Sequence, residues 1–173
     1  MEQNMKLLTT LLLTATLAFG LEVGQMPSTI TLEGDKGALV TGEPFSSTML
    51  RDKVYVLFYV DPDEKELNSH VSAALKAEKF DRANYGSIAV INMAATWLPN
   101  FAIASKLEKK QEEFPDTIYA KDLESVLVKE WDLKDDSSNV VLFGKDGKVL
   151  FIVKGKLSNV DVRLLISIIK DNL

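Results

Sequence analysis

The chain has 173 residues, of which 46% are hydrophobic and 26% charged, and its formal net charge is −5 at pH 7. These proportions are those of one globular domain, and the acidic surface disfavours binding to the phosphate backbone of nucleic acids. The absence of cysteine excludes disulfide bonds, thiolate chemistry and lipid attachment to an N-terminal cysteine.

The first 20 residues are typical of a cleaved secretory signal peptide. Lys6 precedes the uncharged apolar stretch 7–19, and the small residues Ala18 and Gly20 stand three and one before a cleavage point after Gly20. A membrane anchor is the alternative interpretation, but a spanning helix needs about 20 apolar residues and this run is shorter. We therefore expect export without a stable membrane anchor, and one domain over residues 21–173.

The mature chain opens with short strand-forming segments. Residues 30–32 and 38–40 flank a turn containing two glycines, and we predict that they form a small hairpin. Residues 54–60, VYVLFYV, are apolar, aromatic and β-branched on both faces. This pattern predicts a central strand that is covered by helices on both sides.

An acidic turn follows this strand and opens a helix. Asp61 is the predicted N-cap, Pro62 suits the first helical position, and Glu64 completes a capping box. Apolar side chains then recur at helical spacing from Leu67, and the helix is predicted to end near Lys79.

Residues 87–93, SIAVINM, predict a second buried strand, with a loop over 94–99 and a helix after it. Trp97 lies in this loop, at the strand end where open α/β sheets bind ligands. Packing of Trp97 onto the next helix is the alternative. The residues predicted to share the buried face of that helix are Phe101, Ala104, Leu107 and Gln111.

A third strand is predicted over residues 117–120. Asp122 is then the predicted cap of a helix that ends near Trp131, a residue interpreted either as core or as support for the loop that follows. Residues 139–143 and 148–154 flank a Gly-Lys-Asp-Gly turn, which is a strong hairpin signal.

Ser158 and Asp161 predict a capping box that opens the last helix, over residues 159–171. This segment is apolar at so many positions that we expect most of its circumference to be covered. The order of a hairpin, alternating strands and helices, a second hairpin and a closing helix predicts an α/β fold. We expect a three-layer sandwich around a mixed central sheet.

This order of elements resembles the thioredoxin-like fold, and several segments are similar to the YtfJ family of exported thioredoxin-like proteins from Gram-negative bacteria. The similar segments are Leu21–Gln25, Lys53–Leu57, Trp131–Leu133, Ser137–Val141 and Lys145–Gly147. The resemblance covers nearly all of the mature chain, and it implies a thioredoxin-like fold and a periplasmic location. The family has no agreed activity.

The resemblance also marks two departures from thioredoxin-like redox enzymes. Those enzymes carry a reactive cysteine at the turn where this chain has Asp61 to Glu64, and a cis-proline in the loop where it has Asp135 to Asn139. We interpret the carboxylates as capping anions. The polar loop either recognises a bound peptide or satisfies its own backbone.

We expect neither a metal nor another cofactor. Three carboxylates at a cap fall short of the six or more oxygens that calcium requires, and a lone histidine in a chain without cysteine cannot make a zinc site. His70 is interpreted as a boundary residue of its helix, with a lone general base as the alternative.

The sequence therefore predicts a binding module without redox activity, whose partner is an envelope protein or peptide and not a nucleic acid. The candidate binding residues are Asp61, Asp63, Glu64, Thr96, Trp97, Ser137, Ser138 and Asn139. The alternatives are an enzyme or small-ligand binder that uses the same carboxylates, and a structural envelope component. The sequence does not determine the oligomeric state.

Overall fold

A six-stranded mixed sheet organises the chain, with the strand order β2-β6-β5-β4-β7-β8. The computed structural model describes residues 20–173, so the predicted signal peptide lies outside the described residues except for Gly20. The strands are β2 (Gly37–Leu39), β4 (Val54–Val60), β5 (Tyr85–Asn92), β6 (Thr117–Asp122), β7 (Ser138–Phe143) and β8 (Val149–Lys154). Strands β4, β5 and β6 are parallel, whereas β2, β7 and β8 pair antiparallel with their neighbours. The predicted α/β class with a mixed central sheet is confirmed.

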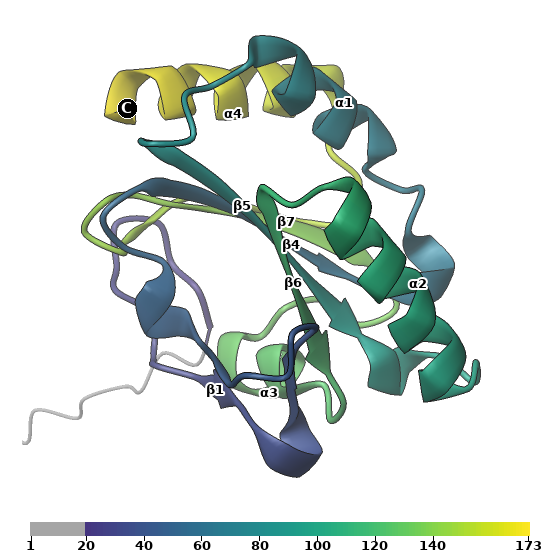
Figure 1. Cartoon of the computed structure of the whole chain (residues 1–173). Helices are drawn as coiled ribbons and strands as arrows, with labels where there is room; N and C mark the ends of the chain where they lie inside the picture. Colours follow the sequence, from purple (N-terminus) through teal and green to yellow (C-terminus); the bar gives the residue numbers. More distant parts are fainter. Residues whose placement is uncertain (1–19) are drawn as a thin grey trace, which may run out of the picture.

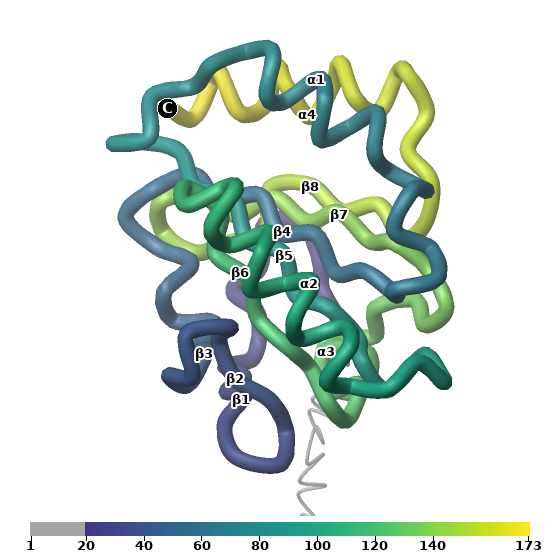
Figure 2. Tube along the Cα trace, turned by 45° about the vertical axis from the view of Figure 1, so that its right-hand side comes forward, coloured from purple at the N-terminus to yellow at the C-terminus, as the bar shows by residue number. Residues whose placement is uncertain are grey.

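Three helices cover one face of the sheet (Figures 1 and 2). They are α1 (Ser69–Glu78), α2 (Asn100–Glu113) and α4 (Asn159–Asn172). Strands β4, β5 and β6 are neighbours in the sheet in the order in which they follow along the chain. The right-handed connections β4–α1–β5 and β5–α2–β6 therefore place α1 and α2 on the same side. The short α3 (Val126–Trp131) lies on the other face.

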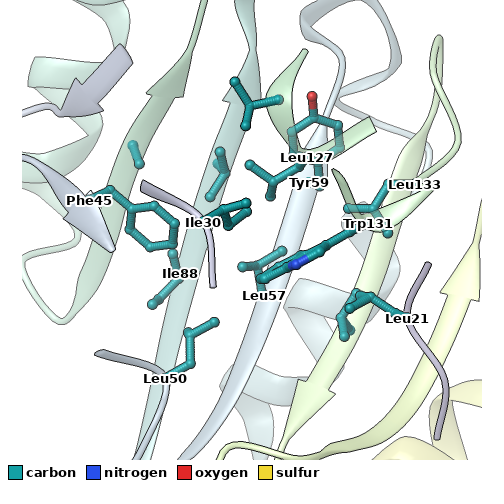
Figure 3. Close-up of a cluster of buried hydrophobic side chains, with 14 of the residues drawn as sticks. Leu21, Ile30, Phe45, Leu50, Leu57, Tyr59, Ile88, Leu127, Trp131 and Leu133 are labelled. Atoms are coloured by element: carbon teal, nitrogen blue, oxygen red, sulfur yellow. The ribbon is translucent and has the colours of Figure 1, made fainter. Parts of the chain in front are cut away.

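The N-terminal segment completes the layer on the α3 face. Figure 3 shows Leu21, Ile30 and Phe45 from this segment among the side chains around Trp131. The indole Nε1 of Trp131 donates to the carbonyl of Ser28 at 2.9 Å, and the side chain is 1% exposed. Trp131 is therefore a core residue, which confirms the first of its two interpretations.

The N-terminal strands pair differently from the predicted hairpin. Strand β1 (Thr31–Leu32) pairs antiparallel with β3 (Phe45–Ser46), whereas β2 joins the edge of the main sheet beside β6. Gly37 allows this approach, because a Cβ atom at its φ of +134° would stand 1.9 Å from the Lys121 carbonyl oxygen. The local turn signal was correct, but the partners of both strands come from further along the chain.

The helix after the acidic turn begins later than predicted. Pro62–Glu64 forms a 3-10 turn, and α1 begins only at Ser69. The Asp61 carboxylate accepts from the Asp63 N–H at 2.8 Å, which confirms the cap. The capping box with Glu64 is wrong, because the Asp61 N–H that it requires donates instead to the Ser137 carbonyl at 2.9 Å.

Two predicted buried faces are also wrong in part. Phe101 is 78% exposed, because Ile103 and Leu107 are the α2 residues that pack on the sheet. In α4, Val160 and Leu164 are exposed, so residues 20–173 cover only part of the circumference of this helix. The buried residues of α4 are Val162, Leu165 and Ile169.

The signals at the C-terminal end of the chain are confirmed. Strands β7 and β8 form the predicted hairpin. The Ser158 hydroxyl accepts from the Asp161 N–H, and the Asp161 carboxylate accepts from the Ser158 N–H at 2.8 Å, so the capping box of α4 is complete. These motifs depend only on residues close in sequence, which explains why they could be predicted.

Candidate binding edge

The carboxyl ends of three parallel strands meet at one edge of the sheet, which we call the carboxyl-end edge. Asp61 follows β4, Asn92 ends β5 and Asp122 ends β6, while the antiparallel β7 begins there at Ser138. Ligands of open α/β sheets bind at this edge because the loops that follow the strands converge there.

The structure brings four of the candidate residues together at this edge. The Asp61 N–H donates to the Ser137 carbonyl, which ties the acidic turn to the loop before β7. The Thr96 hydroxyl donates to the Asp63 carboxylate at 2.9 Å, which ties the same turn to the loop after β5. Asp61 lies beneath the surface at 3% exposure, whereas Asp63 is exposed.

The surroundings of Asp61 favour its neutral form. Burial raises the pKa of Asp61, and the negative charges of Asp63, Asp136 and Glu64 raise it further, although the hydrogen bond from the Asp63 N–H acts in the opposite direction. Because the pKa is higher in the folded chain than in the unfolded chain, ionisation of Asp61 opposes folding at neutral pH. The ionised Asp61 carboxylate in this turn therefore lowers the stability of the folded chain.

The loop before β7 satisfies its own polar groups. Ser137, Ser138 and Asn139 are all buried. The Asn139 side chain accepts from the Lys134 N–H at 2.9 Å and donates to the Lys134 carbonyl at 2.8 Å, which closes the loop on itself. A partner at this edge would therefore touch the other candidates first: Asp63, Glu64, Thr96 and Trp97.

Sequence reasoning missed Asn68, which connects three segments beneath the edge. Its amide donates to the carbonyls of Ser138 at 3.0 Å and Gly155 at 2.9 Å, and its carbonyl accepts from the Leu157 N–H at 3.0 Å. Asn68 is 3% exposed. The available signal was a polar residue immediately before a helix, but its partners are 70 to 89 residues away.

A second buried network, also missed in large part, lies under the ends of β5 and β6. The Asp122 carboxylate accepts from the Tyr59 hydroxyl at 3.0 Å and from the N–H groups of Val126 and Leu127. Asp122 therefore accepts from the first N–H groups of α3 as a cap would, but the helix begins at Val126 and not at Leu123 as predicted, and Ser125 occupies its N-cap position. Burial first, and the Asp122 charge second, raise the pKa of Tyr59, so its hydroxyl stays protonated as a donor. Asn92 lies beside this network and donates to Asp135 at 2.8 Å.

Trp97 is the most exposed large hydrophobic side chain among residues 20–173, at 86%. The alternative interpretation, in which Trp97 packs onto α2, is therefore wrong. Phe101, four residues further along at the start of α2, is 78% exposed. We call these two residues the aromatic pair, and no other aromatic residue stands among the exposed large hydrophobics of the described chain.

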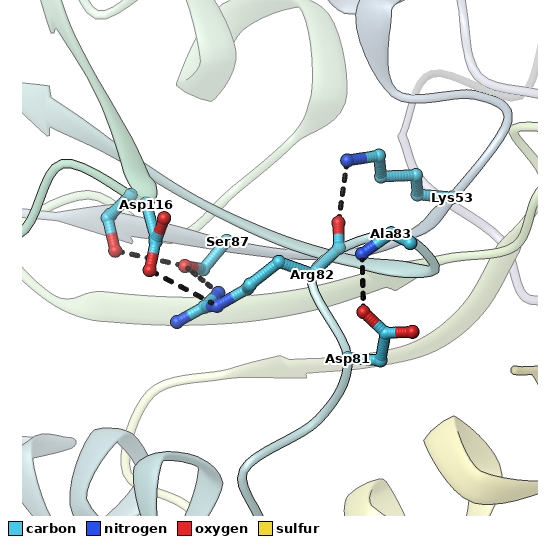
Figure 4. A network of polar contacts seen from close by, with 7 residues as sticks. Lys53, Asp81, Arg82, Ala83, Ser87 and Asp116 are labelled. Atoms are coloured by element: carbon cyan, nitrogen blue, oxygen red, sulfur yellow. Dashed lines mark hydrogen bonds and ion pairs between the residues drawn. The ribbon is translucent and has the colours of Figure 1, made fainter.

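The opposite edge of the sheet is polar by contrast (Figure 4). There the Lys53 ammonium donates to the Arg82 carbonyl at 2.7 Å, and the Asp81 carboxylate accepts from the Ala83 N–H at 2.9 Å. Arg82 also pairs with Asp116 at 3.8 Å. These are ordinary surface contacts, so the exposed aromatic area is particular to the carboxyl-end edge.

His70 is half-buried at the border of α1, and its ring Nε2 bonds the Leu157 carbonyl at 3.0 Å. A carbonyl oxygen only accepts, so Nε2 carries the proton, and the contact fits the boundary interpretation. Within residues 20–173, no group of three or more His, Asp or Glu side chains has an arrangement that could hold a metal ion. None of the helices in that range combines the length and the apolar character that a membrane span needs.

A family model described as "bacterial protein of unknown function (YtfJ_HI0045)" matches residues 30–172. The chain belongs to the YtfJ family. Two members are similar to it: the uncharacterized protein YtfJ of Escherichia coli and an uncharacterized protein of Haemophilus influenzae. The first is 28% identical over 86% of this chain and 85% of its own length, and the second 27% identical over 73% and 71%.

Solved structures confirm the thioredoxin-like fold of this YtfJ-family chain. The peroxiredoxin-like protein from Aquifex aeolicus has a TM-score of 0.61 at 11% identity, with 89% of both chains covered. The exposed lipoprotein thioredoxin of Streptococcus pneumoniae has a TM-score of 0.58 at 12% identity, with 83% of this chain and 99% of that chain covered. Identities this low establish the fold alone.

Proposed function

We propose that this YtfJ-family chain is a binding module without redox activity, which holds a segment of another envelope protein at the carboxyl-end edge. The observation that carries the proposal is the 86% exposure of Trp97 beside a turn that its neighbours fix in place. Exposed tryptophan is enriched where proteins bind one another, because a rigid ring buries a large area at a small cost in entropy. A chain without cysteine has no thiolate for disulfide exchange or peroxide reduction.

Charge at this edge indicates which partner segments suit it. Asp63 and Asp136 are exposed and Glu64 is half-buried, and none of the three forms a salt bridge within residues 20–173. Their charges are close enough to act on Asp61 together. A segment with lysine or arginine next to an apolar residue would pair with these carboxylates and could stack its cation on Trp97. Added salt should then weaken the binding.

A photo-crosslinking residue at Asn100 tests this proposal in cells, because Asn100 is exposed at the start of α2 and leaves Trp97 intact. We expect discrete adducts with a specific envelope protein, and we expect Trp97→Ala to abolish them without changing the melting temperature. The matched control carries the crosslinker at Arg163, an exposed residue of α4. Equal adducts at both positions, or adducts that survive Trp97→Ala, would contradict the proposal.

The alternative function, binding of a small ligand, can be tested with the purified protein. A screen of metabolites and metal ions for shifts in melting temperature should give no shift that depends on Asp63. A shift that Asp63→Asn removes would replace the binding-module proposal by the alternative function.

Export is part of the proposal and is supported by the pattern of Lys6 and the apolar stretch 7–19. N-terminal sequencing of the protein from a periplasmic fraction should begin at Leu21. Recovery of the intact N-terminus from the cytosol would contradict export and, with it, the choice of an envelope partner.

A further inference from the structure

An open groove extends from Phe101 along the start of α2, and we call it the α2 groove. Its volume is about 400 Å³, which lies within the range of ligand pockets, about 300–1,000 Å³. The lining residues come from the N-terminal extension, from the ends of β5 and β6, and from α2: Gly34, Gly37, Ala38, Gly42, Met93, Lys121, Leu123, Asn100, Phe101 and Ala104.

Apart from Asn100 and Lys121, the residues that line the α2 groove are apolar or glycine. Phe101 forms an exposed rim, and Met93 is buried at 3% exposure. On the side of the N-terminal extension, Gly34 and Gly42 have positive φ angles, and no atom lies within 4 Å of the place that a Cβ would take. These two glycines therefore add no side chain to the wall of the groove.

Lys121 is the only charged residue among those that line the groove. It lies on β6 two residues after Tyr119, so its side chain points to the α2 face of the sheet, while Asp122 points to the other face. Lys121 is half-buried and takes part in none of the salt bridges found within residues 20–173. The ammonium of a half-buried lysine without a carboxylate partner is complementary to an anionic group that arrives with an apolar one.

We infer that the α2 groove binds an extended peptide segment in which an apolar side chain stands next to an aspartate or glutamate. The apolar side chain enters between Phe101 and the glycines, and the carboxylate pairs with Lys121. This inference rests on the proposed function, and it adds a second contact to the one at Trp97. The binding surface then has opposite charges at its two ends: carboxylates near Asp63 and one ammonium at Lys121. That arrangement would fix the direction in which a segment lies.

Selection from a random heptapeptide library displayed on phage tests the inference with the purified protein. Clones selected by the wild type should be enriched in an apolar residue followed or preceded by an acidic one. Lys121→Glu should change the acidic residue of the selected clones to lysine or arginine. Ala104→Trp should remove the enrichment altogether, because the indole would fill the groove. A synthetic consensus peptide should bind Lys121→Gln about fivefold more weakly than the wild type, as expected for a partly exposed ion pair.

Selection with Trp97→Ala separates this inference from the proposed function. The role of Lys121 is overturned if the selected clones need Trp97 but show no preference for an acidic residue. It is also overturned if the acidic preference persists in Lys121→Glu. Both outcomes leave the binding-module proposal intact. Clones that ignore both Trp97 and the groove overturn both proposals. A wild-type dimer in native mass measurements that Ala104→Trp turns into a monomer would show that a second copy occupies the groove, which also overturns the inference.

Discussion

The carboxyl-end edge consists of two parts that treat polar and apolar groups in opposite ways. Where β4 meets β7, the polar side chains of Asn68 and Asn139 are buried and paired with backbone groups: Asn68 with segments 70 to 89 residues away, and Asn139 with Lys134. Where β5 and β6 end, apolar groups are exposed instead, at Trp97 and Phe101 beside the α2 groove. The part between β4 and β7 holds the loops in place, and the part at the ends of β5 and β6 exposes an apolar surface to solvent.

The difference between the two parts explains how this edge could serve binding, although other proteins with the same fold use it for thiol chemistry. A buried, fully paired network resists movement, because each broken hydrogen bond leaves a polar group without water. Exposed aromatic side chains add little to the stability of the folded chain, so nothing in its folding requires them to be apolar. We therefore expect substitutions in the first part to change stability, and substitutions in the second to change binding.

Asn68→Ala should have the largest effect on stability. The substitution leaves the Leu157 N–H and the carbonyls of Ser138 and Gly155 without their side-chain partner in a buried site. We expect a loss of about 3 kcal/mol in the free energy of unfolding, measured by chemical denaturation. Ser69→Ala, at the exposed neighbouring position, is the control and should change stability by less than about 0.5 kcal/mol. Equal losses would show that Asn68 does not connect the loops.

Asp61→Ala should cost less, about 1 kcal/mol, because it removes the side-chain cap of the Asp63 N–H. Any binding activity should persist when it is corrected for the fraction of folded protein. Complete loss of binding at unchanged stability would contradict the capping role and would make Asp61 a contact residue.

Asp61→Asn should reverse the sign of that effect at neutral pH. The amide oxygen can still accept from the Asp63 N–H, while the charge that burial and the neighbouring carboxylates disfavour is gone. Because the pKa of Asp61 is raised on folding, its ionisation opposes folding above the folded-state pKa, and this penalty disappears as the pH falls below the unfolded-state pKa, about 3.9. Denaturation curves at neutral pH and near pH 3 should show an advantage for Asp61→Asn that shrinks in acid. An advantage that is independent of pH would rule out this electrostatic origin.

Trp97→Ala and Phe101→Ala should have the smallest effect on stability, within about 0.5 kcal/mol of the wild type, because both side chains are mostly exposed. They should also have the largest effect on partner capture, with Trp97→Ala the more severe. Leu164→Ala on α4 is the control for an exposed apolar residue elsewhere, and it should leave capture unchanged. A melting temperature that falls sharply with Trp97→Ala would mean that Trp97 packs against the fold in solution.

The sequence by itself determined the features that depend on neighbours along the chain. The apolar run at residues 54–60, the hairpin between β7 and β8, and the capping box at Ser158 formed where their patterns predicted, because turns and caps are made by residues a few positions apart. The thioredoxin-like fold also followed from the order of these elements.

Tertiary structure alone decided which side chains are buried at the carboxyl-end edge. Contacts across 63 to 89 residues placed Asn68, Tyr59 and Asp122 in buried networks, and the approach of β2 to β6 took the place of the predicted hairpin. The same packing left Phe101 outside, because the sheet receives only one side of α2 and the orientation of a helix is set by what it packs against. A periodic pattern indicates that a helix has an apolar face, but only the assembled layers decide how much of that face is covered.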